Sequence, residues 1–97
     1  MNIVSKTRLK DFWEVHPLAR SPLEHWHGVV SKASWSCFSD VRNTCASADL
    51  VGKNLVVFNV HGNHYRVVAG LSYSLSCVYI KHVLTHSEYD TWNKTIR

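Results

Sequence analysis

The chain has 97 residues, of which 45% are hydrophobic and 11% aromatic, and its formal net charge is +4. This composition excludes a disordered chain, and the length predicts a single domain over residues 1–97. The positive charge favours a polyanionic partner, such as nucleic acid or an acidic protein. No apolar stretch approaches the roughly 20 residues that a membrane-spanning helix needs.

The three cysteines, Cys37, Cys45 and Cys77, form an odd set without CxxC spacing. They argue against a disulfide framework and favour a reducing compartment. The first residues also lack the continuous apolar run of a secretory signal. We therefore expect a cytoplasmic protein.

The N-terminal third predicts a short strand and a helix. Ile3 and Val4 are candidates for the strand, and Ser5 is the expected N-cap of a helix over residues 6–15. Leu9, Phe12 and Trp13 form its apolar stripe. The helix should end before Pro17, because the residue that precedes a proline is disfavoured in the α region.

A second helix is expected from Ser21 to about residue 33. Ser21 as cap, Pro22 at the first helical position and Glu24 together match a capping box. Trp26 should lie on its core-facing side. Residues 34–49 predict a loop with a short helical turn near 39–43, and Gly52 predicts a turn before the next strand.

Three strands are expected next, over residues 55–60, 65–71 and 77–84. Gly62 and Asn63 lie in the turn between the first two, and both residue types tolerate positive φ. Strands that are joined by short turns pair antiparallel. We therefore expect an antiparallel sheet.

Strict alternation of side chains along these strands groups four polar residues on one sheet face. These residues are Asn59, His64, Arg66 and Lys81. An arginine and a lysine on one open face can form an anion site. On spacing alone, a solvated face that keeps the sheet soluble is the favoured explanation. Alternation also places Leu84 with Val78 and Ile80 on the opposite face.

Thr85 and Glu88 have capping-box spacing, which predicts a helix that starts at His86. The positive end of a helix disfavours imidazolium, so a histidine there suits a proton acceptor near neutral pH. An exposed, structurally neutral helix-terminal histidine is the alternative. Tyr89 can share a face with His86, either as a site phenol or as a core aromatic. Asp90 suits the helix dipole without any function.

Two histidine pairs have spacings that occur in metal sites, His61 with His64 and His82 with His86. The first pair spans a turn and the second crosses the expected strand–helix boundary. No cysteine pair completes a ligand set, so we expect no structural metal. The chain also lacks a P-loop and a GxGxxG motif, and we expect no cofactor.

The segments VVFNVHGNHYRVVAG (residues 56–70) and VYIKHVLTHSEYD (78–90) are similar to a known family. Together with the opening RLKDFWEVHP (8–17), they resemble the RelE-like ribonuclease toxins, and more narrowly the HigB-type toxins of type II toxin–antitoxin systems. The resemblance covers nearly the whole chain. It departs from the family pattern at His61 and His64, where many relatives carry lysine, and at His82, where an apolar residue is common.

The resemblance implies an α+β, RelE-like two-layer domain of order β-α-α-β-β-β-α. Two N-terminal helices would cover one face of an antiparallel sheet, with a short C-terminal helix at its edge. It implies an mRNA interferase that cleaves RNA without metal, through attack by the 2′-hydroxyl, on the translating ribosome. The catalytic residues would be Arg66, His86, Tyr89 and Lys81, and the RNA-binding residues Lys53, Asn59, His61, Asn63 and His64.

The implied partners are mRNA, the ribosome and an antitoxin with a helix-turn-helix DNA-binding domain. Two other functions remain open at this point. One is a non-catalytic module that binds RNA or protein through the basic face. The other is an inactive toxin homologue that still binds its antitoxin, which the histidines in place of lysines motivate.

Overall fold

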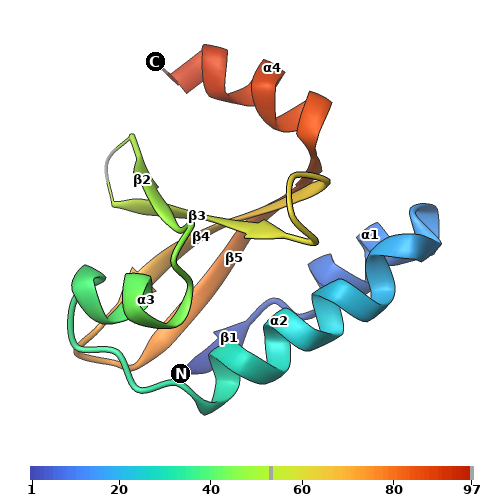
Figure 1. Cartoon of the computed structure of the whole chain (residues 1–97). Helices are drawn as coiled ribbons and strands as arrows, with labels where there is room; N and C mark the ends of the chain where they lie inside the picture. Colours follow the sequence, from blue (N-terminus) through green and yellow to red (C-terminus); the bar gives the residue numbers. More distant parts are fainter. Residues whose placement is uncertain (53, 97) are drawn as a thin grey trace.

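A computed structural model describes residues 1–52 and 54–96 of the chain (Figure 1). One short 3-10 turn, four α-helices and five strands occur in these residues. In chain order they are β1 (Asn2–Val4), α1 (Thr7–Val15), the turn η1 (Pro17–Ala19), α2 (Arg20–Lys32), α3 (Phe38–Thr44), β2 (Asp49–Val51), β3 (Leu55–Val60), β4 (Tyr65–Ser72), β5 (Cys77–Thr85) and α4 (His86–Ile96). Over the described residues, no helix has the length and apolar character needed to cross a bilayer.

The five strands form one mixed sheet in the order β1-β5-β4-β3-β2. Strands β2 to β5 pair antiparallel with their neighbours, but β1 runs parallel to β5. The expectation of a purely antiparallel sheet was therefore wrong. The element order also gains β2, a strand of three residues that is too short to show a clear period in the sequence. The short helical turn predicted near residues 39–43 is confirmed as α3.

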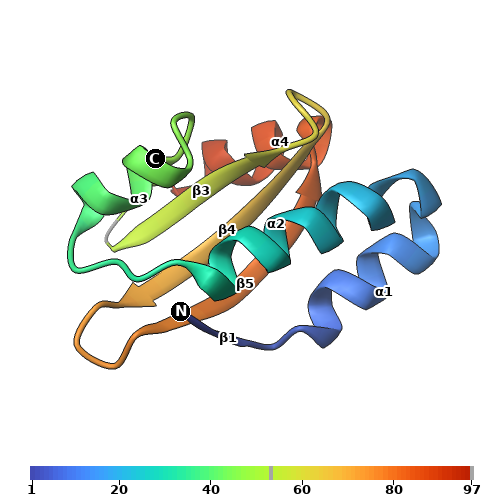
Figure 2. The same cartoon turned by 60° about the horizontal axis from the view of Figure 1, so that its bottom comes forward.

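The larger core lies between the sheet and the helices α1, α2 and α3 (Figure 2). Phe58 of β3 is at its centre, with the ring of Trp26 5.3 Å away edge-on and that of Trp35 6.0 Å away in a stacked arrangement. Leu9 is fully buried, and Phe12 and Trp13 pack against the same core. The predicted apolar stripe of the first helix and the core position of Trp26 are thus confirmed.

Helix α4 crosses the opposite face of the sheet (Figures 1 and 2). The sequence had instead predicted this helix at the edge of the sheet. Its residues Tyr89 and Trp92 pack on a second, smaller core of Val51, Val57 and Val68. These valines would otherwise expose an apolar surface on the face that alternation had assigned to polar residues. Covering them gives a third layer, so this face is only partly open.

A β-bulge at Lys81 explains why alternation failed along β5. Ile80 pairs with Ala69 and His82 pairs with Val68, so Lys81 is the additional residue on its strand. After the bulge, each side chain of β5 lies on the face opposite to the one that strict alternation predicts. Leu84 consequently packs toward α4, and Val83 packs against the larger core.

The expected N-caps of the first two helices were also wrong. Ser5 has a left-handed φ of 72° and precedes α1, whose cap is Lys6. Helix α2 begins at Arg20, because the turn η1 leads into it without a break. Glu24 therefore pairs with Arg20, at 3.1 Å, and does not complete a capping box with Ser21.

Candidate functional site

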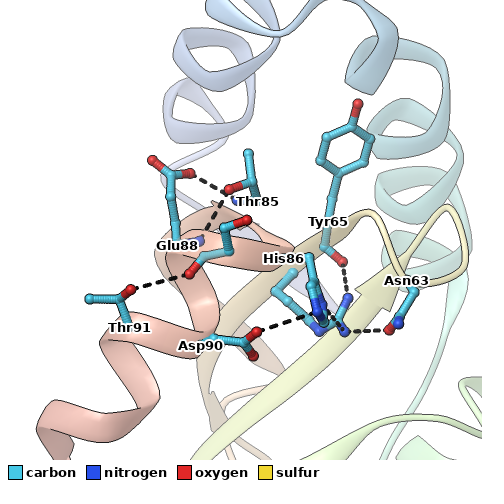
Figure 3. A network of polar contacts seen from close by, with 9 residues as sticks. Asn63, Tyr65, Thr85, His86, Glu88, Asp90 and Thr91 are labelled. Atoms are coloured by element: carbon cyan, nitrogen blue, oxygen red, sulfur yellow. Dashed lines mark hydrogen bonds and ion pairs between the residues drawn. The ribbon is translucent and has the colours of Figure 1, made fainter.

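The start of α4 meets the start of β4 in a compact polar cluster (Figure 3). Arg66 comes from β4, Asn63 from the turn that precedes it, and His86 and Asp90 from the first turns of α4. These four residues are called the Arg66–His86 cluster below. Tyr65 points its ring away from the cluster, while its backbone carbonyl faces Arg66 (Figure 3).

The predicted capping box at Thr85 is confirmed and positions His86. The amide of Glu88 donates to Oγ1 of Thr85 at 3.2 Å, and the amide of Thr85 donates to Oε1 of Glu88 at 2.9 Å (Figure 3). The backbone N–H of His86 donates to the carbonyl of His64 at 3.0 Å. Two local bonds and one bond to the β3–β4 turn thus fix the histidine at the first position of α4.

Arg66 is the only buried charged residue of the described chain, with 6% of its surface exposed. Its guanidinium donates to the carbonyl of Tyr65 at 3.1 Å, to Oδ1 of Asn63, and to Nδ1 of His86 at 3.2 Å. The same group lies 5.5 Å from the centre of the Tyr89 ring. Packing and hydrogen bonds therefore hold this cation in one place.

The partners of Arg66 are neutral acceptors and an aromatic ring, and none of the ion pairs found among the described residues includes it. A buried cation without a carboxylate beside it is costly, and an incoming anion relieves that cost. The guanidinium fork matches the oxygens of a phosphate. The cluster is thus suited to bind and stabilise a phosphate group.

The tautomer of His86 follows from its two neighbours. Arginine can only donate, so Nδ1 of His86 must accept and the proton of the neutral ring lies on Nε2. Nε2 is 3.3 Å from Oδ2 of Asp90, which can accept that proton's hydrogen bond. An acidic residue thus orients the imidazole from one side and Arg66 from the other.

The structure separates the predicted site residues into two groups. Tyr89 and Asn63 contact Arg66, and Asn59 lies opposite Arg66 on the neighbouring strand. Lys81 lies elsewhere: Arg66 is level with Leu84, three residues along β5, or about 10 Å at the usual strand rise. The ammonium of Lys81 lies instead 5.9 Å from the Tyr79 ring.

The remaining predicted RNA-binding residues lie either at the β3–β4 turn or outside the residues that the structure describes. His61 and His64 are both exposed in the β3–β4 turn, next to the cluster. Their rings stack on each other with centroids 5.0 Å apart. Lys53 lies outside the described residues. Within residues 1–52 and 54–96, no group of three or more metal-ligating side chains is arranged to hold an ion.

Asp90 is the residue that sequence reasoning missed, because the helix dipole explained it sufficiently. The signal was its spacing: four residues after His86 on a helix places it on the same face. A second feature is an open hollow of about 760 Å³ beside α2 and α3, which the segment Asn59–His61 also lines. It is lined mainly by apolar and neutral polar residues, and so offers less of the required charge than the cluster does.

The fold and the cluster define a small α+β protein with a phosphate-suited arginine beside an oriented histidine. The sequence pattern of a family described as the RelE-like toxic component of a toxin–antitoxin system, HigB toxin, matches residues 19–92. This match covers more than half of the chain. The protein belongs to the HigB toxin family.

Curated relatives agree with this assignment. The chain is 31% identical over 93 residues to the mRNA interferase toxin HigB of Escherichia coli, a match that covers 93% of this chain and 88% of the relative. The mRNA interferase HigB of Shigella flexneri matches at the same identity and coverage. A further mRNA interferase HigB, from Escherichia coli strain CFT073, is 24% identical over 99 residues, with 100% of this chain and 96% of the relative covered.

Proposed function

We propose that this chain is the toxin of a type II toxin–antitoxin module and acts as an endoribonuclease on mRNA. The observation that carries the proposal is the Arg66–His86 cluster, in which a buried guanidinium donates to one ring nitrogen of His86 while Asp90 lies beside the other. Membership of the HigB toxin family and the names of its relatives support the same activity. The protein acts in the cytoplasm, where its substrate is translated.

The proposed reaction is metal-independent cleavage of an RNA backbone. The 2′-hydroxyl attacks the adjacent phosphorus while the bond to the 5′-oxygen breaks, leaving a 2′,3′-cyclic phosphate and a free 5′-hydroxyl. This reaction needs a base for the hydroxyl proton, positive charge for the phosphorane and a proton for the departing oxygen. His86 is the candidate base, Arg66 the charge stabiliser, and Tyr89 the candidate proton donor.

The hydrogen bonds of the free protein imply an exchange of partners when RNA arrives. Nδ1 of His86 accepts from Arg66, so its lone pair is occupied before substrate binds. A phosphate that takes the guanidinium for itself would release Nδ1 to accept the 2′-hydroxyl proton. The carboxylate of Asp90 would then stabilise the imidazolium that forms. Substrate binding and activation of the base are thus coupled through one arginine.

Lys81 and the exposed residues of the β3–β4 turn would contact the RNA on either side of this centre. The substrate is mRNA on the translating ribosome, which would present the strand unpaired and in a fixed register. An antitoxin with a helix-turn-helix DNA-binding domain would neutralise the protein. The family assignment supports an antitoxin partner, and the net charge of +4 suits binding to RNA.

The test is primer extension on a defined mRNA in a translation extract, with purified protein and with ribosomes present or depleted. We expect cuts that need ribosomes and that disappear in His86→Ala, whereas the exposed α2 variant Lys32→Ala cuts normally. Cuts without ribosomes would support the nuclease activity and contradict its dependence on the ribosome. Free RNA incubated with EDTA would then test metal independence.

The absence of cuts from a folded wild-type protein would overturn the proposal. Two further readouts would then separate the alternatives. Binding of mRNA without cleavage would indicate a binding module. Binding of the co-encoded antitoxin, without RNA binding and without growth inhibition, would indicate an inactive toxin homologue.

A further inference from the structure

Three aromatic rings lie together at the β3–β4 turn and the first residue of β4, next to Asn63, which the turn presents to the Arg66–His86 cluster. The rings of His61 and His64 are stacked 5.0 Å apart, and that of Tyr65 is 6.3 Å from His61 and 6.1 Å from His64. This group of His61, His64 and Tyr65 is called the ring platform below. Tyr65 anchors it, because its half-buried ring meets Phe12 edge-on at 5.7 Å.

The turn that carries the platform is held in place by the catalytic cluster. Asn63 accepts a hydrogen bond from Arg66, and the carbonyl of His64 accepts the N–H of His86 at 3.0 Å. Within the turn, the N–H of His64 donates to the carbonyl of His61 at 3.2 Å. One short turn thus presents Asn63 to the cluster and two histidine rings to the adjacent surface.

The backbone of His61 supports a role for this arrangement. Its φ is 55°, in the left-handed region that residues other than glycine seldom adopt. Gly62 follows with a φ of 62°, which it adopts without strain. The left-handed backbone of His61 accompanies an exposed ring that is stacked on a neighbour.

We propose that the ring platform stacks an unpaired RNA base next to the scissile phosphate, and so positions the substrate strand on the Arg66–His86 cluster. The inference rests on the proposed function, because it assigns the neighbouring nucleotide of the same substrate. Unpaired bases bind to exposed aromatic rings through their π faces, largely without regard to base identity. The platform would therefore supply affinity and register more than sequence preference.

Stacking and phosphate contact by this turn can be distinguished through salt. A lysine at position 64 would contact the backbone as a charge and release a counterion, which adds about one to the slope of log affinity against log salt concentration. A neutral imidazole carries no charge and would add little to that slope. If the turn binds RNA by stacking, the affinity of the wild-type protein should therefore fall less with increasing salt concentration than that of a His64→Lys variant.

The experiment uses a 2′-O-methyl RNA oligonucleotide, which lacks the attacking hydroxyl and cannot be cleaved, with 2-aminopurine at one position in each member of a series. Fluorescence of 2-aminopurine is quenched by stacking. With wild-type protein at pH 8 and low salt, in EDTA so that no metal bridges the two imidazoles, we expect quenching at one or two positions only. The double variant His61→Ala/His64→Ala should lose the quenching and bind about tenfold more weakly.

Two variants and one control make the result specific. His64→Phe keeps a ring without polar atoms and should retain the quenching. His64→Lys should bind with a steeper salt dependence and without the quenching. The control is His27→Ala, a histidine of α2 near Lys6 and Trp13, which should match wild type. Circular dichroism and thermal unfolding confirm that each variant is folded.

The proposal is overturned if folded His61→Ala/His64→Ala quenches as wild type does, if His64→Phe behaves as the alanine variant does, or if wild type binds no oligonucleotide. The outcome is independent of the proposed nuclease activity. Cleavage in the translation extract without quenching would contradict the proposed stacking and support the nuclease activity. Quenching without any cleavage would support the stacking and contradict the nuclease activity.

Discussion

Oδ2 of Asp90 lies 3.3 Å from Nε2 of His86, one helical turn along α4 (Figure 3). Arg66 donates to the other ring nitrogen of the same histidine. The imidazole is therefore held between a carboxylate and a guanidinium, and its tautomer is determined by both. This relationship gives Asp90 a positioning role and makes it the first residue to test.

We predict that Asp90→Asn reduces cleavage roughly a hundredfold, at the lower end of the range that acid–base groups contribute, and leaves stability nearly unchanged. Both side chains of the pair are about half exposed, so the contact itself adds little to folding. The asparagine can still accept from Nε2, but it lacks the charge that stabilises imidazolium. Initial cleavage rates in the extract measure the effect, with the exposed α1 variant Glu14→Gln as control. Equal rates for Asp90→Asn and wild type would contradict the positioning role.

Substitutions of Arg66 should separate charge from geometry. Arg66→Lys keeps a cation, but its donors diverge from one nitrogen, whereas the guanidinium uses two nitrogens to reach its three acceptors. Cleavage should therefore fall at least a hundredfold. Arg66→Ala should also lower the free energy of unfolding by about 1–3 kcal/mol, because partly buried acceptors lose their donor. Urea denaturation, run beside the cleavage assay, distinguishes the two effects.

An Arg66→Lys variant that cleaves at the wild-type rate would show that a positive charge alone is sufficient. In that case the planar arrangement of donors on the guanidinium would be irrelevant to the reaction. The exposed arginine of the Arg20–Glu24 pair provides the matched control, since Arg20→Lys should change neither cleavage nor stability.

The capping box offers a way to displace His86 without touching it. We expect Thr85→Ala to cost about 0.5–2 kcal/mol, because the amide of Glu88 loses its acceptor, and to reduce cleavage as the start of α4 frays. Thr85→Ser retains the hydroxyl and should restore both stability and cleavage. Amide hydrogen exchange over residues 86–90 reports the fraying directly. Loss of activity in Thr85→Ser as well would show that the methyl group, and not the cap, matters.

The sequence predicted those parts of the site that depend on local chemistry. The start of α4 follows from Thr85 and Glu88, which are three residues apart and whose side chains each accept a bond from the other's backbone amide. The turn around Gly62 follows from its tolerance of positive φ. Such features can be predicted from the sequence, because the residues that form them are neighbours in the chain.

The features that sequence reasoning missed depend on contacts between distant segments. Nothing in the alternation along β5 marks Lys81 as an additional residue, since a bulge is defined by the partner strand. The burial of Arg66 depends on α4 covering the sheet face, and so on Tyr89 and Trp92 packing against distant valines. Lys81 was predicted beside Arg66 on the assumption that side chains alternate without interruption along β5. The bulge interrupts that alternation.

The last prediction concerns pH and His82, whose ring lies 5.3 Å from that of Trp92. Burial lowers the pKa of His82 below its ordinary value of 6.5, and the positive charges of Arg8 and Lys81 lower it further. Asp11 also lines the shallow hollow beside this ring. The folded state therefore takes up the proton less readily than the unfolded state does.

Well above pH 6.5 the ring is neutral in both states and contributes no dependence on pH. As the pH falls below that value the unfolded chain binds the proton first, so the free energy of unfolding decreases until the folded pKa is passed. We expect His82→Leu, which keeps an apolar side chain against Trp92, to reduce this acid loss between pH 7.5 and 5.5. Urea denaturation at both pH values measures it. The exposed α2 variant His25→Leu is the control, and an acid loss in His82→Leu as large as that of wild type would contradict the assignment.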